Sequence, residues 1–459
     1  MNQYIHNQEG VKMKIYRLFT IIMLAILSGN GLYSASPTGY QRFMQGPMVG
    51  FVTSDEITIW GRLSGAHTGE IEYAVSRDFT QSSTLALSAK KEDDYVLKWT
   101  LKGLQPDTRY YYRFKVEGKV PRYQRDLPPF HTKTAPAEGE NGRFSVAFGS
   151  CPRYQLDRKQ EIWSTILQSQ PDLFFWLGDN IYGDTLDPEI LAEEWRRQRD
   201  VASLQPVLHS IPQLAVWDDH DFGLNDYDRR HPRKAEALAV FRRYSANPAY
   251  GLPETPGVFF QYRYGGVDFF FIDCRYHRDP NKEPDHPEKT LLGKGQRAWL
   301  EQSLKDSDAP FKVIISGSGW SKGKGPGADS WASYLQERDS LFDFIRDNNV
   351  SGVILLSGDT HKGELNAIPW SQKGGYDFYD LVSSPLGQTP LEVNPKRKPE
   401  VRIRKVFTRE ENFGFLEFDM TGDPVLRFTL IGKSGREAWD PFVIRADELV
   451  NGVVSWKGK

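Results

Sequence analysis

Six mainly apolar runs in the second part of the chain restrict its fold more than any other feature. They cover residues 144–148, 173–177, 213–217, 267–272, 312–315 and 352–356. Strands that are apolar along their whole length are covered on both faces, as in α/β proteins. Helix-like segments separate most of these runs, at about 157–169, 188–199, 234–244, 295–307 and 331–348. We therefore expect an α/β core that ends in two antiparallel strands, 413–418 and 425–430.

The first part of the chain has a different pattern. From about residue 46 to 134, short alternating strands are separated by turn residues, which is typical of a β-sandwich. The stretch from Gly103 to Phe114 resembles the E–F corner of fibronectin type III domains, in which a tyrosine, here Tyr110, tethers the turn. A polar segment at 135–142 follows. We expect a signal peptide at 1–36, an immunoglobulin/fibronectin III-like sandwich at 37–140 and a second domain at 141–459.

The N-terminal segment predicts export. Basic residues at 13–17 precede a mainly apolar stretch at 18–27, and small residues follow at 34–36. The alternative is a membrane anchor, but the apolar stretch is shorter than the roughly 20 residues that a spanning helix needs. We therefore expect a signal peptide and a periplasmic or extracellular protein, with no stable membrane span.

The composition is typical of a globular protein and does not indicate a particular binding partner. The 459 residues carry a formal net charge of −2, so neither nucleic acid nor an anionic membrane is indicated as a partner. Two cysteines are too few for a disulfide scaffold. A disulfide between Cys151 and Cys274 is the alternative to two free thiols, and the sequence leaves both open. The oligomeric state is open as well.

Side chains that bind metals or move protons follow four of the six runs. They are Cys151 after the first run, Asp179 and Tyr182 after the second, Asp219 and His220 after the third, and Asp359 and His361 after the sixth. Each alone has an ordinary structural explanation, such as a helix cap or a core residue. In open α/β sheets, however, ligands bind outside the carboxyl ends of the strands. The combination therefore favours one shared site.

The types of these side chains predict the chemistry of that site. Thiolate, phenolate and carboxylate together suit a transition metal of high charge, and imidazole completes its shell. Carboxylates shared with a second cation, bound mainly through oxygen, would make a two-metal site. Such a pair activates water and holds the oxygens of an in-line displacement at phosphorus.

Four ordered motifs resemble those of the PhoD-like alkaline phosphatases, a branch of the calcineurin-like metallophosphoesterases. They are Phe148-Gly-Ser-Cys, Leu177-Gly-Asp-Asn-Ile-Tyr, Trp217-Asp-Asp-His-Asp and Ser357-Gly-Asp-Thr-His. The resemblance covers about residues 143–430. It implies a metallophosphoesterase-type β-sandwich core flanked by helices, preceded by an all-β domain.

The resemblance also implies roles for single residues. Iron(III) would be held by Cys151, Asp179, Tyr182 and His361. Asp179 would bridge to a second metal, calcium or another divalent cation, with Asp359 and Asp219 as further ligands. Catalytic roles fall to His220, which would contact the phosphoryl group or protonate the leaving oxygen, and to Asp219. Substrate binding falls to Asn225 and Arg275.

The sequence thus predicts an exported, metal-dependent hydrolase of phosphomonoesters, phosphodiesters or both. One alternative is a phosphodiesterase or phospholipase that uses the same site. Another is an exported surface-binding protein with a vestigial phosphatase domain. The chain has Ser316-Gly-Ser-Gly-Trp where family members often have an Ala-Asn-Gln-like run, so we expect differences in substrate contacts or in a second-metal ligand there.

Overall fold

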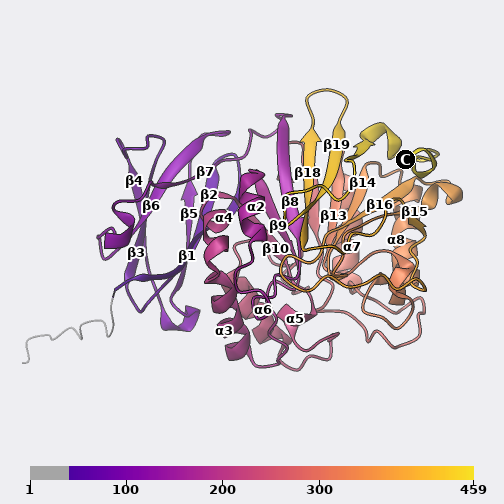
Figure 1. Cartoon of the computed structure of the whole chain (residues 1–459), viewed down its shortest axis with the longest axis horizontal. Coiled ribbons are helices and arrows are strands. Elements are labelled where there is room, and N and C mark those ends of the chain that lie inside the picture. Colours follow the sequence, from indigo (N-terminus) through magenta and orange to yellow (C-terminus); the bar gives the residue numbers. More distant parts are fainter. Residues whose placement is uncertain (1–40) are drawn as a thin grey trace, which may run out of the picture. The chain divides into compact units, whose positions relative to one another are not determined.

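The computed structural model describes residues 41–459 (Figure 1). The predicted signal peptide lies outside the described residues. Within residues 41–459, no helix has both the length and the apolar character needed to span a bilayer.

The first part of the described chain forms two antiparallel sheets. One contains β1 (Phe43–Val52), β2 (Glu56–Leu63) and β5 (Val96–Lys102). The other has the order β4-β3-β6-β7, from β3 (Thr68–Ala74), β4 (Ser83–Ser88), β6 (Arg109–Val116) and β7 (Phe130–Lys133). Trp60, Trp99 and Phe114 are buried in this part. The backbone N–H of Gln105 donates to the Tyr110 hydroxyl at 2.8 Å, as expected for a tyrosine corner. The expected all-β N-terminal part is therefore confirmed.

The second part contains two larger sheets. A six-stranded sheet has the order β10-β9-β8-β18-β19-β20. Its strands are β8 (Arg143–Gly149), β9 (Leu173–Leu177), β10 (Gln213–Val216), β18 (Asn412–Asp419), β19 (Val425–Gly432) and β20 (Phe442–Arg445). Strands β8, β9 and β10 run parallel, whereas β18 pairs antiparallel with β8 and β19.

A seven-stranded sheet has the order β11-β12-β13-β14-β16-β15-β17. Its strands are β11 (Phe260–Tyr264), β12 (Val267–Phe271), β13 (Lys312–Ser316), β14 (Val353–Ser357), β15 (Glu364–Pro369), β16 (Asp377–Val382) and β17 (Val401–Arg402). The central strands β12, β13, β14 and β16 are parallel. The ring of Phe175 in β9 packs against Phe269 and Phe271 in β12, both at 5.0 Å between centroids. The two sheets thus share one core, and the expected β-sandwich arrangement is confirmed.

Helices flank the two sheets, except for the short helix at 219–222, which follows the end of β10. They are α2 (Ile162–Gln168), α3 (Pro188–Arg199), α4 (Gln205–Ser210), α5 (Asp219–Phe222), α6 (Lys234–Tyr244), α7 (Lys294–Asp306) and α8 (Leu335–Asp347). Trp163 of α2 packs on Phe174 of β9, and Phe342 of α8 packs on Phe378 of β16. In Figure 1, α2, α3 and α6 lie on the side of β9 and β10, whereas α8 lies on the side of β15 and β16. The six apolar runs are therefore covered by helices on one face and by the opposite sheet on the other.

Two predicted helices are shorter than expected. The segment 157–161 forms a turn, in which Asp157 accepts hydrogen bonds from the backbone N–H groups of Lys159 and Gln160, and α2 begins at Ile162. A 3₁₀ turn, Trp331–Ser333, precedes α8. The predicted helices at 188–199 and 234–244 have the expected bounds. For α3, Pro188 at the first position and the Asp187 cap explain the sharp start.

Polar contacts connect the two parts of the described chain. The Trp60 indole N–H donates to the carbonyl of Arg243 at 2.8 Å, and the Tyr262 hydroxyl donates to the carbonyl of Val52 at 2.7 Å. Strand β7 ends at Lys133 and β8 begins at Arg143. A domain boundary at 140 remains a prediction.

Candidate metal centre

The four motifs meet at one end of the two-sheet core. Cys151 follows β8, Asp179 follows β9, Asp219 follows β10 and His361 follows β14. Because β8, β9 and β10 are parallel neighbours, their carboxyl ends lie at the same edge of one sheet. The opposite sheet contributes the end of β14. In Figure 1, β8, β9 and β10 are labelled near the centre and β14 is labelled to their right.

Asp179 is the centre of this arrangement. Groups of three side chains whose ligand atoms lie within 4.8 Å of one another are Cys151/Asp179/His361, Asp179/Asp219/His220 and Asp179/Asp218/Asp359. A fourth group, Asp218/Asp219/Asp329, lies beside them. The Cys151 thiol donates to Asp179 Oδ2 at 3.3 Å, and the Tyr182 hydroxyl lies 3.3 Å from His361 Nε2. The structure therefore brings together all of the predicted metal ligands.

The backbone at these positions is strained. Cys151, Asp179, Asp359 and His361 have φ angles of 61°, 50°, 65° and 52°. Residues other than glycine rarely adopt positive φ, and such residues cluster at functional sites. Gly178, with φ of 86°, precedes Asp179, and a Cβ there would lie 2.7 Å from Cβ of Asp218. The turn after β9 thus depends on glycine to bring Asp179 beside the third motif.

Burial determines the protonation of these side chains in the absence of cations. It raises the pKa of the Cys151 thiol to about 11 and the pKa of Asp179 well above its usual value, and it lowers the pKa of His361 to about 4. Burial also raises the pKa of Asp218 to about 8. Positive charge in the cluster would reverse the shifts of the acids, because it stabilises their anionic forms.

Unpartnered oxygens fit the presence of cations. Asp179 Oδ1 and Asp218 Oδ2 are buried and have no hydrogen-bond partner among the described residues. A buried, unpartnered carboxylate oxygen is unfavourable unless a cation or a solvent molecule satisfies it. The donor set of thiol, phenol, imidazole and carboxylates is one that metal ions accept. The residues present therefore fit a metal centre.

His220 lies at the edge of the cluster. Its Nδ1 is 2.5 Å from Asp184 Oδ1, and its ring packs against that of Tyr182 in a tilted arrangement, with 4.2 Å between centroids. Burial opposes a charge on His220, but the carboxylates of Asp179 and Asp184 raise its pKa to about 10. The imidazolium form is favoured, and Nδ1 is committed to Asp184.

Asp221 has a structural part in placing these residues. Its carboxylate accepts from the backbone N–H of Asp218 at 2.9 Å and from that of Ile181 at 3.0 Å. It also accepts from the Asn180 side chain at 3.1 Å. One buried carboxylate thereby ties the second motif to the third.

Arg275 lies beneath the carboxylates and not at the surface. Its side chain is fully buried and bonds to Asp218, to Asp219 at 3.5 Å and to Asp329 at 2.5 Å. With no exposed atom, Arg275 is placed to orient Asp219 in this structure, and a direct contact with substrate stays a prediction. Asn225 is exposed and lines the cavity above the cluster.

The cavity has a volume of about 280 Å³. Its lining includes Asp179, Asp219, His220, Asp359 and His361, together with a basic set from later in the chain: Lys324, Lys362, Arg397 and Arg402. Cys151 and Tyr182 are buried and are not among its lining residues. Cys151 and Cys274 are both buried and are not bonded to each other, so the disulfide alternative is wrong.

Sequence reasoning missed Asp184, Lys324 and Asp329. The last two lie in the loop after β13, which begins with the unusual Ser316–Trp320 stretch. The Lys324 ammonium bonds to the Asp359 carboxylate and lies 3.1 Å from the carbonyl of Asp329. The sequence at 316–320 departs from the run that is common in the family, which indicated that this loop differs from those of other members. Nothing in the sequence indicated the roles of Lys324 and Asp329.

Family models of known proteins match most of this chain. The family model of PhoD-like phosphatases matches residues 146–430, and that of their N-terminal domain matches residues 30–136. Alkaline phosphatase D of Bacillus subtilis (strain 168) is 30% identical over 336 residues, which cover 62% of this chain and 55% of that protein. The matched region thus spans about half the length of this curated relative.

Two solved structures share the fold. The structure of PhoD superposes with a TM-score of 0.71 at 21% identity, covering 85% of this chain and 91% of that chain. Purple acid phosphatase PPD1 from yellow lupin (Lupinus luteus) seeds superposes with a TM-score of 0.63 at 16% identity, covering 89% and 74%. Because the family model spans all four motifs and most of the chain, this protein belongs to the PhoD-like phosphatase family.

Proposed function

We propose that this chain is an exported, metal-dependent hydrolase of phosphoric esters that acts in the cavity beside Asp179. The position of Asp179 carries the proposal. Its carboxylate belongs to a thiol–imidazole group and to two carboxylate-containing groups at once, and its Oδ1 has no partner among the described residues. A carboxylate placed in this way is suited to bridge two cations.

The donor types assign the two cations. We assign iron(III) to Cys151, Asp179, Tyr182 and His361, because thiolate and phenolate suit a metal of high charge. We assign calcium or another divalent cation to Asp179, Asp219 and Asp359, which offer only oxygen. When bound, the pair would supply an activated water and stabilise negative charge on the phosphoryl oxygens.

The remaining residues bind the ester and move its proton. With Nδ1 held by Asp184, His220 is left with Nε2 to donate a proton to the leaving oxygen. Asp219 is fixed from two sides, by Arg275 and by the backbone N–H of Asp226 at 2.8 Å. Asn225 lines the same cavity and would bind an ester oxygen.

The proposed activity includes hydrolysis of both phosphomonoesters and phosphodiesters. Lys362 and Arg397 line the cavity beyond the cluster and form no ion pair within residues 41–459, whereas Arg402 is paired with Glu364 at 3.3 Å. The two unpaired cations favour esters that carry a further negative group. The full set of donors, with unpartnered buried oxygens, argues against a vestigial site. The basic and apolar segments at 13–17 and 18–27 support export, although they lie outside the described residues.

Two variants separate metal binding from proton transfer. Asp179→Asn replaces the anionic bridge by a neutral amide and should lower metal content as well as activity. His220→Ala should keep the wild-type metal content and lower kcat by about 10²–10⁴, with a smaller loss for nitrophenyl than for alkyl esters. Metal content is measured by mass spectrometry. The turnover number kcat is measured with both nitrophenyl and alkyl esters.

Three results would contradict the proposal. Wild-type protein loaded with iron and calcium that hydrolyses neither monoesters nor diesters would refute the activity. Equal loss of metal in both variants would make His220 a ligand. An equal proportional loss on nitrophenyl and alkyl esters would remove its role as the leaving-group acid.

A further inference from the structure

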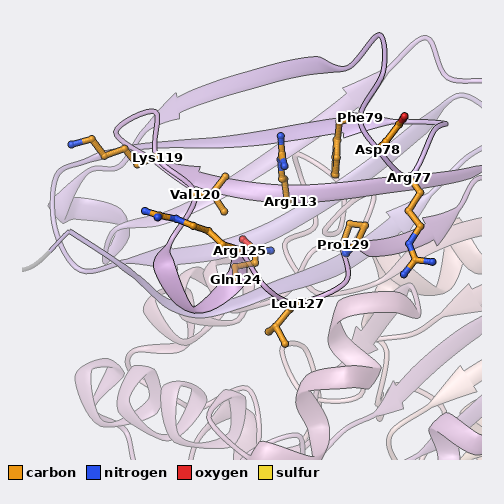
Figure 2. A pocket seen from close by; sticks show the side chains of 10 residues that line it. All are labelled: Arg77, Asp78, Phe79, Arg113, Lys119, Val120, Gln124, Arg125, Leu127 and Pro129. Carbon is orange, nitrogen blue, oxygen red and sulfur yellow. The ribbon is translucent and has the colours of Figure 1, made fainter.

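A cavity on the N-terminal sandwich shares no residue with the metal centre. Its volume is about 550 Å³, within the range of small-molecule sites. It is lined by the turn between β3 and β4, by β6 and by the segment between β6 and β7: Arg77, Asp78, Phe79, Arg113, Lys119, Val120, Gln124, Arg125, Leu127 and Pro129 (Figure 2). Neither the proposed hydrolysis nor the tyrosine corner uses any of them.

The charge of this cavity is positive. Asp78 is the one acidic residue of the lining, whereas Arg77, Lys119 and Arg125 are exposed and form no ion pair within residues 41–459. Figure 2 shows Arg77 on one side and Lys119 and Arg125 on the other. Arg113, between them, is neutralised by Glu72 at 2.6 Å. Three cations without partners around one hollow favour an anionic ligand.

A buried amide points to a ligand as well. Gln124 is only 4% exposed, yet neither its amide oxygen nor its amide nitrogen has a hydrogen-bond partner in the described part of the chain. Buried polar atoms are nearly always hydrogen-bonded, because leaving them unpaired is unfavourable. Gln124 lines the cavity, so a ligand there can satisfy both a donor and an acceptor.

The middle of the cavity is aromatic and apolar. The ring of Phe79 packs on the Arg113 guanidinium, with 4.2 Å from Cζ to the ring centroid. Figure 2 shows Pro129 near Phe79 and Val120 on the side of Lys119. Phe79 keeps a φ of 61°, which is unfavourable for a bulky residue and presents its ring at this place. Such a surface suits a ligand that has a flat or apolar face as well as charge.

We propose that this cavity binds an acidic oligosaccharide. The apolar face of a sugar ring would pack against Phe79 and Pro129, and hydroxyl groups would pair with the Gln124 amide. The acidic groups, carboxylate or phosphate, would lie against Arg77, Lys119 and Arg125. The sandwich thereby holds an anionic glycan while the metal centre acts elsewhere in the chain.

Titration calorimetry on the full chain tests this binding with four probes. They are tetragalacturonate, phosphorylated maltotetraose, neutral maltotetraose and inorganic tetrapolyphosphate. At least one of the two acidic sugars should bind with a Kd below about 1 mM, and that sugar should bind about tenfold or more tightly than the neutral sugar and tetrapolyphosphate. Which acidic sugar binds identifies carboxylate or phosphate as the recognised group.

Variants locate the binding in the sandwich. Arg125→Glu reverses the charge of an exposed side chain, and Gln124→Leu replaces the amide by an apolar group of similar size. Each should weaken the binding by about tenfold. Lys91→Glu, an exposed change of the same kind in the sandwich outside the cavity, is the matched control and should leave binding unchanged. All three should hydrolyse nitrophenyl phosphate like the wild type.

Four outcomes would overturn the inference. The first is that neither acidic sugar binds. The second is that maltotetraose binds as tightly as the acidic sugars, which would remove the role of charge. Tetrapolyphosphate binds equally well, which leaves non-specific attraction between charges. Binding survives both Arg125→Glu and Gln124→Leu, which moves it to another surface. Each outcome leaves the proposed hydrolase activity untouched, because the two sites share no residue.

Discussion

Asp94 connects the N-terminal sandwich to the helices of the second part of the chain. It follows the 3₁₀ turn Lys91–Asp93 and accepts from Arg62 of β2, from Arg196 of α3 at 2.8 Å and from the Tyr244 hydroxyl of α6. Burial alone would raise the pKa of Asp94, but hydrogen bonds from Arg62 and Tyr244 outweigh it and lower the pKa from 3.8 to about 2. The anionic form is therefore stabilised by folding.

The expected destabilisation follows from this pKa. At about 1.4 kcal/mol for each pKa unit, the fall from 3.8 to about 2 corresponds to at most about 2.5 kcal/mol, and solvent screening of the partly exposed carboxylate reduces this to about 2 kcal/mol. Asp94→Asn keeps the shape of the side chain and removes its charge. We expect it to lower the free energy of unfolding by about 2 kcal/mol at neutral pH.

The dependence on pH has a defined sign. Because the folded pKa is depressed, the contribution is fully present above the unfolded value of 3.8 and is lost as pH falls through about 2. The difference between wild type and Asp94→Asn should be constant from about pH 5 to 8 and fall to about half at pH 3. Urea denaturation followed by tryptophan fluorescence measures this difference in the free energy of unfolding.

A neighbouring residue gives the control. Glu92 lies in the same turn, is exposed and forms no side-chain ion pair within the described residues, so Glu92→Gln should change stability by less than about 0.5 kcal/mol. A double-mutant cycle of Asp94→Asn with Arg196→Met isolates the contact between the two parts. If Asp94→Asn cost no more than Glu92→Gln, or if its effect did not diminish below pH 4, the reasoning would be refuted.

Two further predictions concern tyrosines. Tyr110→Phe removes the acceptor for the Gln105 N–H and should lower the free energy of unfolding by about 0.5–1.5 kcal/mol, with kcat kept; a stable variant that has lost turnover would contradict this. Tyr182→Phe should remove or shift a visible charge-transfer band of the iron-loaded protein, measured by absorption spectroscopy. A colourless wild type that is fully active with zinc alone would refute the iron assignment.

The candidate site was predictable to the extent that its residues follow apolar runs directly. Cys151, Asp179 and His361 lie within a few residues of a strand end, and a strand fixes where its own end points. Asp329 lies well beyond the end of β13, and its contact with Arg275 depends on how the intervening loop packs. The contact of Asp184 with His220 likewise joins residues that are far apart in the sequence. No local pattern encodes such contacts.

The fold, like the site, was predictable where it depends on local sequence and not where it depends on packing between distant elements. Local apolar patterns determined that 173–177 and 353–357 are buried strands, because side chains alternate across a strand and both faces here are apolar. Only the tertiary structure decided that β9 and β14 belong to different sheets, and that β18, from far along the chain, pairs with β8. Hydrophobic burial is non-directional, so a sequence can require that a face be covered without stating which element covers it. That choice, made by packing across the two-sheet core, placed Asp359 and His361 beside Asp179 and left Arg275 buried among Asp218, Asp219 and Asp329.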